Sequence, residues 1–304
     1  MFDIIGKRFW YFAISGILIL AGLIALFVYG LDPSIEFQSG SEVTVSFANP
    51  VDKQAVAQAL NELGYNTAVV RKAGADFILA LPELDDAAKT SLRAGMVEKL
   101  GEFRDGGFEK VSAKAASDMT RNTLLAVLIS SFGMLLYISW AFHKMPNPFR
   151  WGVCAIVALI CDLLIVLGLF ALLGGLFGWQ VDLMFVAAIL TVIGYAVNDT
   201  IVVFDRIREN VRNYGDSDFE SVVNASLVET MSRTLITGLG TLFVLISLMI
   251  IIGEPIQNMV VVLLVGILAG TYGSIGTAAS LLVVWKNGEW GRFIGRKPVA
   301  LAAK

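Results

Sequence analysis

Residues 194–210 read GYAVNDTIVVFDRIREN, a segment that starts inside an apolar run and ends in a dense cluster of charges. Asp199 therefore lies in a segment that otherwise has the composition of a membrane-spanning helix. A carboxylate there costs roughly 2.5–3.5 kcal/mol on insertion scales, so we expect it to avoid lipid. Gly194 and Ala196 let another helix approach closely, and Asn198 offers a polar partner. Our working hypothesis is that Asp199 takes up and releases protons inside a helix bundle.

The composition is that of a membrane protein rather than a soluble one. Of the 304 residues, 56% are hydrophobic and only 16% are charged. The formal net charge of −3 says nothing about nucleic acid, but no basic tract with interleaved aromatic residues appears, so we expect no nucleic-acid partner. One histidine and two cysteines leave no metal cluster. We therefore expect a lipid bilayer around the chain, no metal, and no cofactor other than protons as the coupling ion.

Six apolar runs approach or exceed the length of about 18 residues that suggests a spanning helix. They cover residues 10–29, 124–142, 153–177, 183–204, 235–252 and 259–285. The first run is longer than the apolar core of a cleaved signal peptide, and no small-residue cleavage site follows it, so we interpret it as a retained helix. These runs predict an α-helical polytopic membrane protein with six transmembrane helices.

Lysine and arginine are distributed unevenly between the short connections. They occur after the second and fourth runs and in the tail 286–304, whereas residues 178–182 and 253–258 contain none. Positively charged connections stay on the cytoplasmic side, so both termini are predicted to be cytoplasmic. Tryptophans near the ends of the runs, including Trp10 and Trp151, are expected to lie at the membrane interfaces.

The composition turns polar between the first two runs, and residues 32–121 are predicted to form a domain on the outer side. Strand-like and helix-like patterns follow one another there in the order β-α-β-β-α-β. The strands are expected at 42–47, 67–71, 77–81 and 108–113, and the helices at 52–63 and from 85 to about 103. This order suggests a ferredoxin-like α+β domain. The predicted division of the chain is 1–31, 32–121, 122–285 and 286–304.

Single residues are expected to set the ends of these elements. Asp52 and Asp85 precede the two helices as candidate N-caps, and Gly64 follows the first helix as a stop signal. Turns are expected around Gly74 and at residues 106–107, the second of which leads into the last strand.

Three ionisable residues lie in or beside the predicted spans. Asp162 is nine residues into the third run, about 13.5 Å along a helix, and therefore near the bilayer centre. Asp199 lies about 7.5 Å from the cytoplasmic end of the fourth run. Arg233 stands just before the fifth run and is the natural cation to approach Asp199. A buried carboxylate beside a cation can change its protonation near neutral pH, so we predict proton conduction by these three residues.

Each of these residues also has a structural interpretation. Asp199 could be held by the side chain of Asn198 or Thr200 without exchanging a proton. Asp162 could make structural hydrogen bonds, and Arg233 could be an ordinary residue of the positively charged cytoplasmic side. In the proton-conducting interpretation, Asn198 and Thr200 are the polar side chains expected to support Asp199.

Gly266 and Gly270 form a G-x-x-x-G pair in the last run. Such a pair predicts a helix face that packs closely against another helix. The other helix could belong to a partner subunit or to this chain, and the sequence leaves both alternatives open.

Two motifs resemble those of a known family. Residues 198–210 read NDTIVVFDRIREN and residues 232–237 read SRTLIT, and both are similar to motifs of SecF. SecF is a subunit of the bacterial protein-export accessory complex SecDF, in the RND superfamily. The resemblance covers essentially the whole chain, because the six spans and the single outer domain also fit, and it implies an RND-like half.

The resemblance implies partners and a driving force. The partners would be a SecD-like subunit of the same layout, the SecYEG translocon, and an unfolded preprotein emerging on the outer side of the bacterial plasma membrane. The proton-motive force would drive the complex as it assists Sec-dependent translocation. In the family, the residues matching Asp199 and Arg233 are implicated in proton conduction, and the aspartate matching Asp162 is a family feature.

The chain departs from the family pattern at several positions. Ala196 and Gly238 stand where the family often has serine, and Cys161 stands where a histidine is common. Ser39 stands where the family usually has the first of two glycines. These differences remove polar groups from the proposed proton path and leave the shape of the turn at Ser39 open.

Two other functions fit parts of the pattern. An RND-type exporter half for a small molecule or lipid would need a large apolar pocket in the outer domain, and the sequence shows no obvious one. An intramembrane aspartyl protease would need Asp162 and Asp199 to share a proton. The sequence lacks the Gly-x-Gly-Asp setting expected around one of these aspartates. We therefore predict a protein that is not an enzyme.

Overall fold

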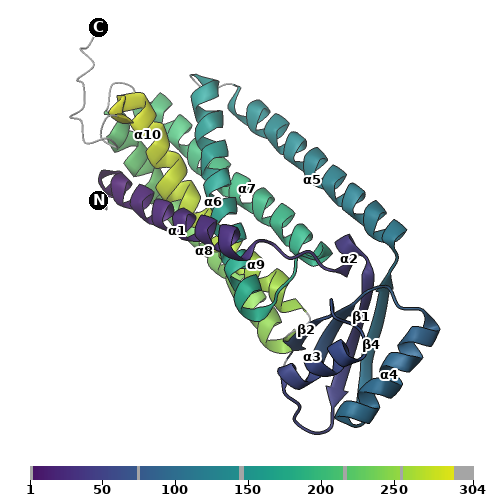
Figure 1. The fold of residues 1–304 in the computed structure, drawn as a ribbon. Coiled ribbons are helices and arrows are strands. Elements are labelled where there is room, and N and C mark those ends of the chain that lie inside the picture. The colour runs from purple at the N-terminus through teal and green to yellow at the C-terminus, as the bar shows by residue number, and fades with distance from the viewer. Residues whose placement is uncertain (1–2, 74–75, 144–146, 215–217, 254–255, 291–304) are drawn as a thin grey trace. The chain divides into compact units, whose positions relative to one another are not determined.

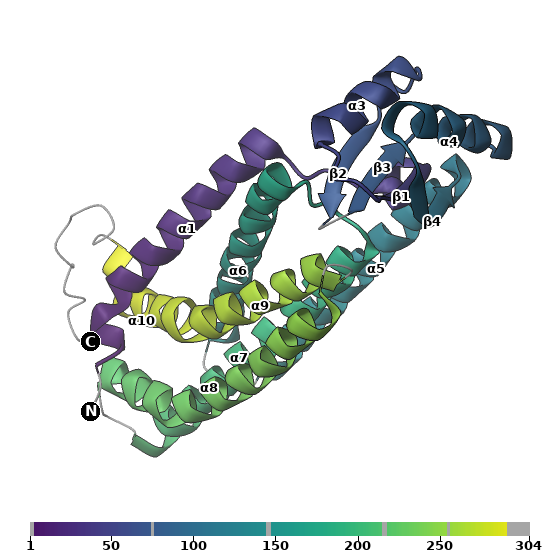
Figure 2. The ribbon, with the colours of Figure 1, turned by 90° about the horizontal axis from the view of Figure 1, so that it is seen from below.

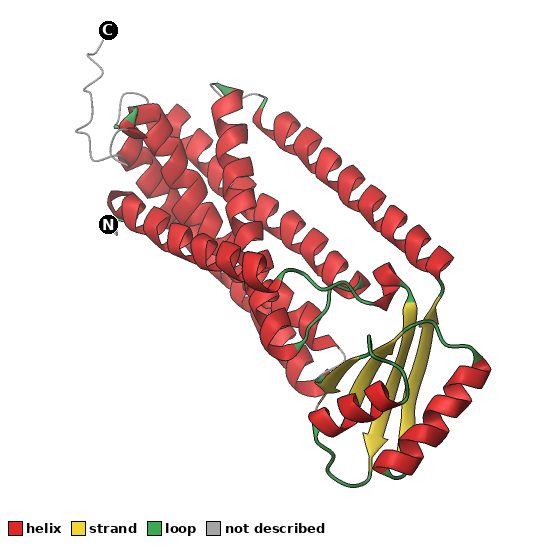
Figure 3. Cartoon of the chain, viewed as in Figure 1, coloured by secondary structure: helices red, strands yellow, loops and turns green. Residues whose placement is uncertain are grey.

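The computed structural model describes residues 3–73, 76–143, 147–214, 218–253 and 256–290 (Figure 1). The chain divides into two compact units. The first comprises Met1–Gly30, Ile129–Leu172 and Ala187–Lys304, and the second comprises Leu31–Leu128 and Leu173–Val186. Among the described residues, all strands belong to the second unit, whereas the first unit is helical (Figure 3).

Within the described residues, six helical stretches are long and apolar enough to cross a membrane, which confirms the six predicted spans. The first is α1 (Arg8–Tyr29), which follows the short 3-10 helix η1 (Ile5–Lys7). The next four are α5 (Ala113–Phe142), α6 (Pro148–Phe177), α7 (Leu183–Tyr214) and α8 (Phe219–Ile252). α7 continues ten residues beyond the predicted run, because the charged residues after 204 remain helical.

The last span is not a single regular α-helix. α9 (Gln257–Tyr272) passes into a π-helical segment, η3 (Gly273–Ala278), and then into α10 (Ala279–Asn287). α8 lies beside α9 in the same unit (Figure 2). The apolar run did not predict the π-helical segment, because hydrophobicity does not distinguish the two backbone bonding patterns. Segments of this kind often mark functional sites.

The main apolar core of the helical unit lies between α6, α7, α8 and α10. Trp151 of α6 meets Phe204 of α7 edge to face, with 5.2 Å between the ring centroids. Trp151 is only 4% exposed, because the aromatic core between α6 and α7 buries its indole ring. Its position at a membrane interface stays a prediction. Trp10 is 73% exposed, as expected for a side chain that faces the membrane.

Glycines bring the last span close to its neighbours in the chain. A Cβ atom at Gly266 would overlap the side chain of Val192 on α7, and one at Gly270 would lie 3.0 Å from the Cβ atom of Ala196. The G-x-x-x-G pair therefore packs against α7 of the same chain. Of the two alternatives left open by the sequence, the structure has the one without a partner subunit at this face.

Four strands form the sheet of the second unit. They are β1 (Gly40–Phe47), β2 (Val69–Ala73), β3 (Asp76–Leu81) and β4 (Phe103–Val111), paired antiparallel in the order β2-β3-β1-β4. α3 (Lys53–Glu62) connects β1 to β2, α4 (Asp86–Leu100) connects β3 to β4, and α2 (Ile35–Gln38) precedes β1. This order confirms the ferredoxin-like domain.

The two helices of this domain pack on one face of the sheet (Figure 1). Val45 and Leu79 point into the core from the two central strands, and Leu60 of α3 and Met96 of α4 cover them. All four side chains are at most 1% exposed. Side chains alternate between the faces of a strand, so every second residue of β1 and β3 contributes to this core.

The predicted helix ends are confirmed in part. Asp85 caps α4, because its Oδ1 accepts the Ala88 N–H at 2.7 Å. Gly64 has a positive φ of 91° and follows α3, as a stop signal should. Asp52 occupies the N-cap position of α3, but its side chain makes no capping hydrogen bond. The turn expected around Gly74 lies outside the described residues.

The end of the domain differs from the prediction. α4 ends at Leu100 rather than near residue 103, because Gly101 takes a positive φ of 88°. β4 then begins at Phe103, so the strand predicted at 108–113 starts earlier and ends at Val111. Residues 106–107 lie inside this strand and do not form a turn. The register shifts there between Thr44 and Val45 of β1, which is a β-bulge.

Candidate functional site

Asp199 is buried between helices of the first unit. It lies on α7 and is 4% exposed. The hydroxyl of Thr271, near the end of α9, donates a hydrogen bond to its Oδ2 at 3.5 Å. The carboxylate is therefore turned away from lipid and toward a polar group, as the cost of placing a charge in lipid requires.

A second hydroxyl group lies close to this pair. Tyr195 precedes Asp199 by about one turn of α7. Its hydroxyl is buried and has no hydrogen-bond partner among the described residues. A Cβ atom at Gly238 of α8 would lie 3.4 Å from both this hydroxyl and Thr271 Oγ1. Three helices thus meet around the polar groups of Tyr195, Asp199 and Thr271.

The two residues predicted to support Asp199 do not contact it. Thr200 is buried, but its hydroxyl donates to the carbonyl of Ala196 at 3.0 Å on the same helix. Asn198 is exposed, and its side chain makes no hydrogen bond with the described part of the chain. Residues adjacent in a helix point about 100° apart, so neither neighbour shares the face of Asp199. Thr271 makes the contact that we expected of them.

Arg233 belongs to α8, one of the helices that meet around Asp199, and is exposed. No hydrogen bond or ion pair joins these two described side chains, so direct or water-mediated contact between them stays a prediction.

Asp162 of α6 has different surroundings. It is 3% exposed and makes no hydrogen bond with the described residues. Its carboxylate lies against Gly273, the first residue of the π-helical segment, where a Cβ atom would overlap it. The two aspartates therefore border the last span two residues apart, at Thr271 and at Gly273. No hydrogen bond joins these two described carboxylates.

The last span also carries a row of hydroxyl groups that was not predicted as part of a site. Residues 270–280 read GTYGSIGTAAS and contain five hydroxyl side chains. The Tyr272 hydroxyl donates to the Tyr11 carbonyl at 2.6 Å, and Ser15 of α1 lies within 3.4 Å of the hydroxyls of both Tyr272 and Thr277. The density of hydroxyl residues was a usable signal, but their partners on α1 required the tertiary structure.

The arrangement offers carboxylates, hydroxyls and a nearby cation inside helices that cross the membrane. Such groups can hold a proton and pass it on without covalent chemistry. Among the described residues there is no group of three or more histidine, cysteine, aspartate or glutamate side chains that could hold a metal ion.

Two family models match the chain. Residues 94–288 match the model of the C-terminal part of the protein-export membrane proteins SecD and SecF. Residues 24–51 match the model of the SecD/SecF GG motif. The first match alone covers more than half of the chain and includes Asp162, Asp199 and Arg233.

Similar proteins and a similar structure agree with these matches. The chain is 38% identical to protein translocase subunit SecF of Thermobaculum terrenum over the full length of both chains. It is 40% identical to the SecF subunit of Anaerolinea thermophila, covering 99% of this chain and all of the other. The crystal structure of SecDF from Thermus thermophilus, a translocon-associated membrane protein, superposes with a TM-score of 0.84 at 30% identity. The match covers 94% of this chain but only 39% of that SecDF chain.

Proposed function

We propose that proton movement past Asp199 drives the role of this chain in protein export, because the chain belongs to the SecF family of protein translocase subunits. The chain is a multi-pass membrane protein with an accessory role in protein translocation, and SecD is its partner in a SecDF complex. The observation that carries the proposal is a buried carboxylate on a spanning helix, with a hydroxyl donor from the last span beside it.

Opposing influences on Asp199 support proton exchange at this residue. Burial disfavours the charged form of a carboxylate, whereas a hydroxyl donor and a nearby cation favour it. Because these influences compete, a small rearrangement of α8 relative to α7 can change the protonation. A charge that crosses the whole membrane field gains about 2.3 kcal/mol per 100 mV, which is enough to shift a bundle between two arrangements.

Asp162 is proposed as a second proton site on the same path. It borders the last span at Gly273, and Asp199 borders it at Thr271. The hydroxyl of Thr271 contacts Asp199, and the hydroxyl of Thr277 lies farther along the last span, 3.3 Å from that of Ser15 on α1. Protons are the proposed coupling ion, and no reaction on a substrate is proposed.

An exposed polar face of α7 supports contact with SecD. Thr191, Asn198 and Asp205 are exposed and recur every seven residues, which places them along one side of the helix. An exposed asparagine in a spanning segment is unfavourable against lipid, whereas another helix can offer it a hydrogen bond. We therefore assign Asn198 to the contact with SecD rather than to the support of Asp199.

The wider setting of the chain is part of the same proposal. The distribution of lysine and arginine supports cytoplasmic termini in a bacterial plasma membrane, with the sheet domain on the outer side. The relative from Thermus thermophilus is described as translocon-associated. By analogy, the SecYEG translocon and the preprotein that emerges from it are the proposed partners of the complex.

The exporter alternative has less support. It requires a large apolar pocket in the sheet domain. One pocket of this domain has a volume of about 370 Å³ and is lined by charged as well as apolar side chains, among them Asp86, Lys89 and Arg93. Such a lining does not favour an apolar cargo.

The test uses SecD, this chain and the translocon reconstituted in vesicles with an imposed proton gradient. Asp199→Asn keeps the shape of the side chain and removes its titration, so gradient-dependent release of preprotein should be lost while assembly with SecD persists. Asp118→Asn is the matched control, because Asp118 is exposed on another spanning helix, α5, and has no part in the proposed proton path or in the proposed contact with SecD, so this variant should release preprotein normally. Normal release by Asp199→Asn would reject the proton role.

A further inference from the structure

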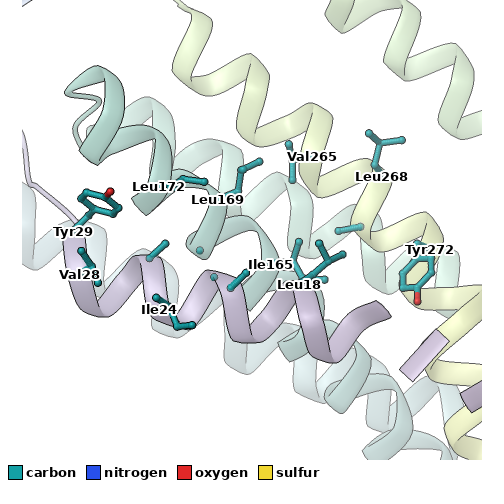
Figure 4. A pocket seen from close by; sticks show the side chains of 15 residues that line it. Leu18, Ile24, Val28, Tyr29, Ile165, Leu169, Leu172, Val265, Leu268 and Tyr272 are labelled. Atoms are coloured by element: carbon teal, nitrogen blue, oxygen red, sulfur yellow. The ribbon is translucent and has the colours of Figure 1, made fainter. Parts of the chain in front are cut away.

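A long apolar groove lies between α1, α6 and α9 in the helical unit (Figure 4). Its volume is about 780 Å³, and all of its fifteen lining residues belong to spanning helices. Tyr29 and Tyr272 lie at its opposite ends, and Leu169 and Leu172 of α6 lie between them (Figure 4). The groove is separate from the contact between Thr271 and Asp199.

The walls of the groove exclude water as its occupant. Apart from the two tyrosines at its ends, the lining residues are glycine, alanine, valine, leucine and isoleucine. The hydroxyl of Tyr272 donates to the Tyr11 carbonyl at 2.6 Å and is therefore already in use. A bound water needs two to four polar partners, which these walls do not provide. A space of this size left empty would forfeit dispersion contacts along its entire lining.

The groove is open to the surroundings of the bundle and closed at its base. Ile24, Val28 and Leu268 line it and are 57%, 65% and 55% exposed. At the base, the backbones of Gly22 and Gly168 approach so closely that a Cβ atom at either would touch the other residue. The neighbouring surface of α1 is equally apolar, so the groove continues a surface that faces the membrane.

The length of the groove fits a hydrocarbon chain. Along α1 the groove runs from Leu18 to Tyr29, a length of about 16 Å. One leaflet of the bilayer has a hydrocarbon thickness of about 15 Å, half of the core. The groove therefore has the length of an acyl chain in a single leaflet.

We infer that this groove binds an acyl chain of a phospholipid, taken from the leaflet in which α1 ends at Tyr29. Aromatic side chains favour the membrane interface, so Tyr29 marks the headgroup end of the bound lipid. The other end of the chain reaches Tyr272, the residue next to Gly273, against which Asp162 packs. The bound chain closes this side of the bundle to water beside a buried carboxylate.

The test uses the full chain in vesicles that contain a phospholipid with a photoreactive diazirine on one acyl chain. After irradiation, mass spectrometry of the digest should find adducts on the lining segments of α6 and α9. Ala21→Trp places a large ring in the groove and should strongly reduce these adducts. Ala13→Trp is the matched control, because Ala13 is also exposed on α1 but does not line the groove, and it should leave the adducts unchanged.

Two results would overturn the inference. Equal labelling of these segments in wild type and in Ala21→Trp would mean that the lipid touches only the outer surface. Loss of labelling of the groove when SecD is co-reconstituted would identify SecD as the occupant. The labelling does not require export, so its outcome is independent of the proton role of Asp199.

Discussion

The helical unit and the sheet domain are stabilised by different kinds of side chain. The domain has a core of large apolar residues such as Phe77, Leu79 and Met96, each at most 2% exposed. The helical unit has apolar core clusters as well, but its closest helix contacts are made by small residues such as Gly266 and Gly270. It also buries hydroxyl groups, two aspartates and an arginine.

The difference arises because the domain folds in water and the helical unit folds in lipid. In water, the burial of apolar surface drives folding, so a small domain needs large core residues. In lipid, an apolar side chain gains little by leaving the surroundings, so helices associate through close packing and interhelical hydrogen bonds. A conservative change can therefore be costly in the bundle even where it would be minor in the domain.

Ion pairs follow the same contrast. In the helical unit, Arg8 is 4% exposed, donates to both carboxylate oxygens of Glu289, and pairs with Glu220 at 2.6 Å. In the domain, Arg71 donates to Glu42 at 2.7 Å with both side chains partly exposed. Burial raises the pKa of the Glu42 carboxyl, and the charge of Arg71 opposes that increase. Disruption of the Arg8 cluster is therefore expected to lower stability more than disruption of the pair between Arg71 and Glu42.

The largest expected effect is that of Arg8→Met. The substitution removes the guanidinium that both Glu289 and Glu220 contact, and breaking a buried pair in this way costs about 3–5 kcal/mol. Thermal unfolding of the purified chain in detergent measures the loss. Adding Glu289→Gln should recover part of it, because the second change removes the buried negative charge that Arg8 balanced.

The exposed Arg212 serves as the control for this prediction. Arg212→Met should change the unfolding free energy by less than about 1 kcal/mol, since only the interaction with the end of α7 is lost. Similar losses for the two arginine variants would contradict the special position of Arg8.

A smaller effect is expected for Gly266→Ala. The new methyl group would overlap Val192, whose branched side chain is completely buried and has little rotamer freedom. Overpacking of this kind costs about 1–3 kcal/mol. The same unfolding measurement applies, and combining the change with Val192→Ala should restore stability by making room for the methyl group.

Gly16→Ala is the matched control, because a Cβ atom at Gly16 meets nothing within 4 Å. In a helix, replacing glycine by alanine is favourable by up to about 1 kcal/mol, so this variant should be at least as stable as the wild type. If Gly266→Ala were equally harmless, the contrast in packing between bundle and domain would lose its support.

The smallest effect is expected at the turn before β1, and it is a gain. Ser39 has φ 66° and ψ 158°, a backbone conformation that is nearly restricted to glycine. Ser39→Gly relieves this strain and should stabilise the domain by about 1 kcal/mol. Ser46→Gly, at an ordinary position of β1, should instead destabilise it by about 0.5–1 kcal/mol. A loss of stability in Ser39→Gly would mean that the turn is not strained.

Much of the site could be predicted from the sequence, but its contacts could not. An acidic residue in an apolar run identified Asp199 and Asp162, because the cost of a charge in lipid depends on composition alone. The hydrogen bond from Thr271 joins residues 72 positions apart, and no local pattern predicts it. Asn198 was the natural partner by proximity along the chain, yet the helix turns it to the exposed side.

The boundaries of the domain show the same limit. The order of strands and helices followed from alternating patterns and from stop signals such as Gly64. The start of β4 at Phe103 did not, because the glycines at 106–107 resemble a turn until β1 pairs with them across a bulge.

By itself, the sequence determined the six spans, the order of elements in the domain and the acidic residues of the membrane, since each depends on the transfer of local segments between water and lipid. Only the tertiary structure decided which groups surround those acids, where the last span becomes π-helical, and that an apolar groove opens beside Tyr272. These features depend on contacts between helices distant in the chain, and the composition of one segment does not specify what packs against it.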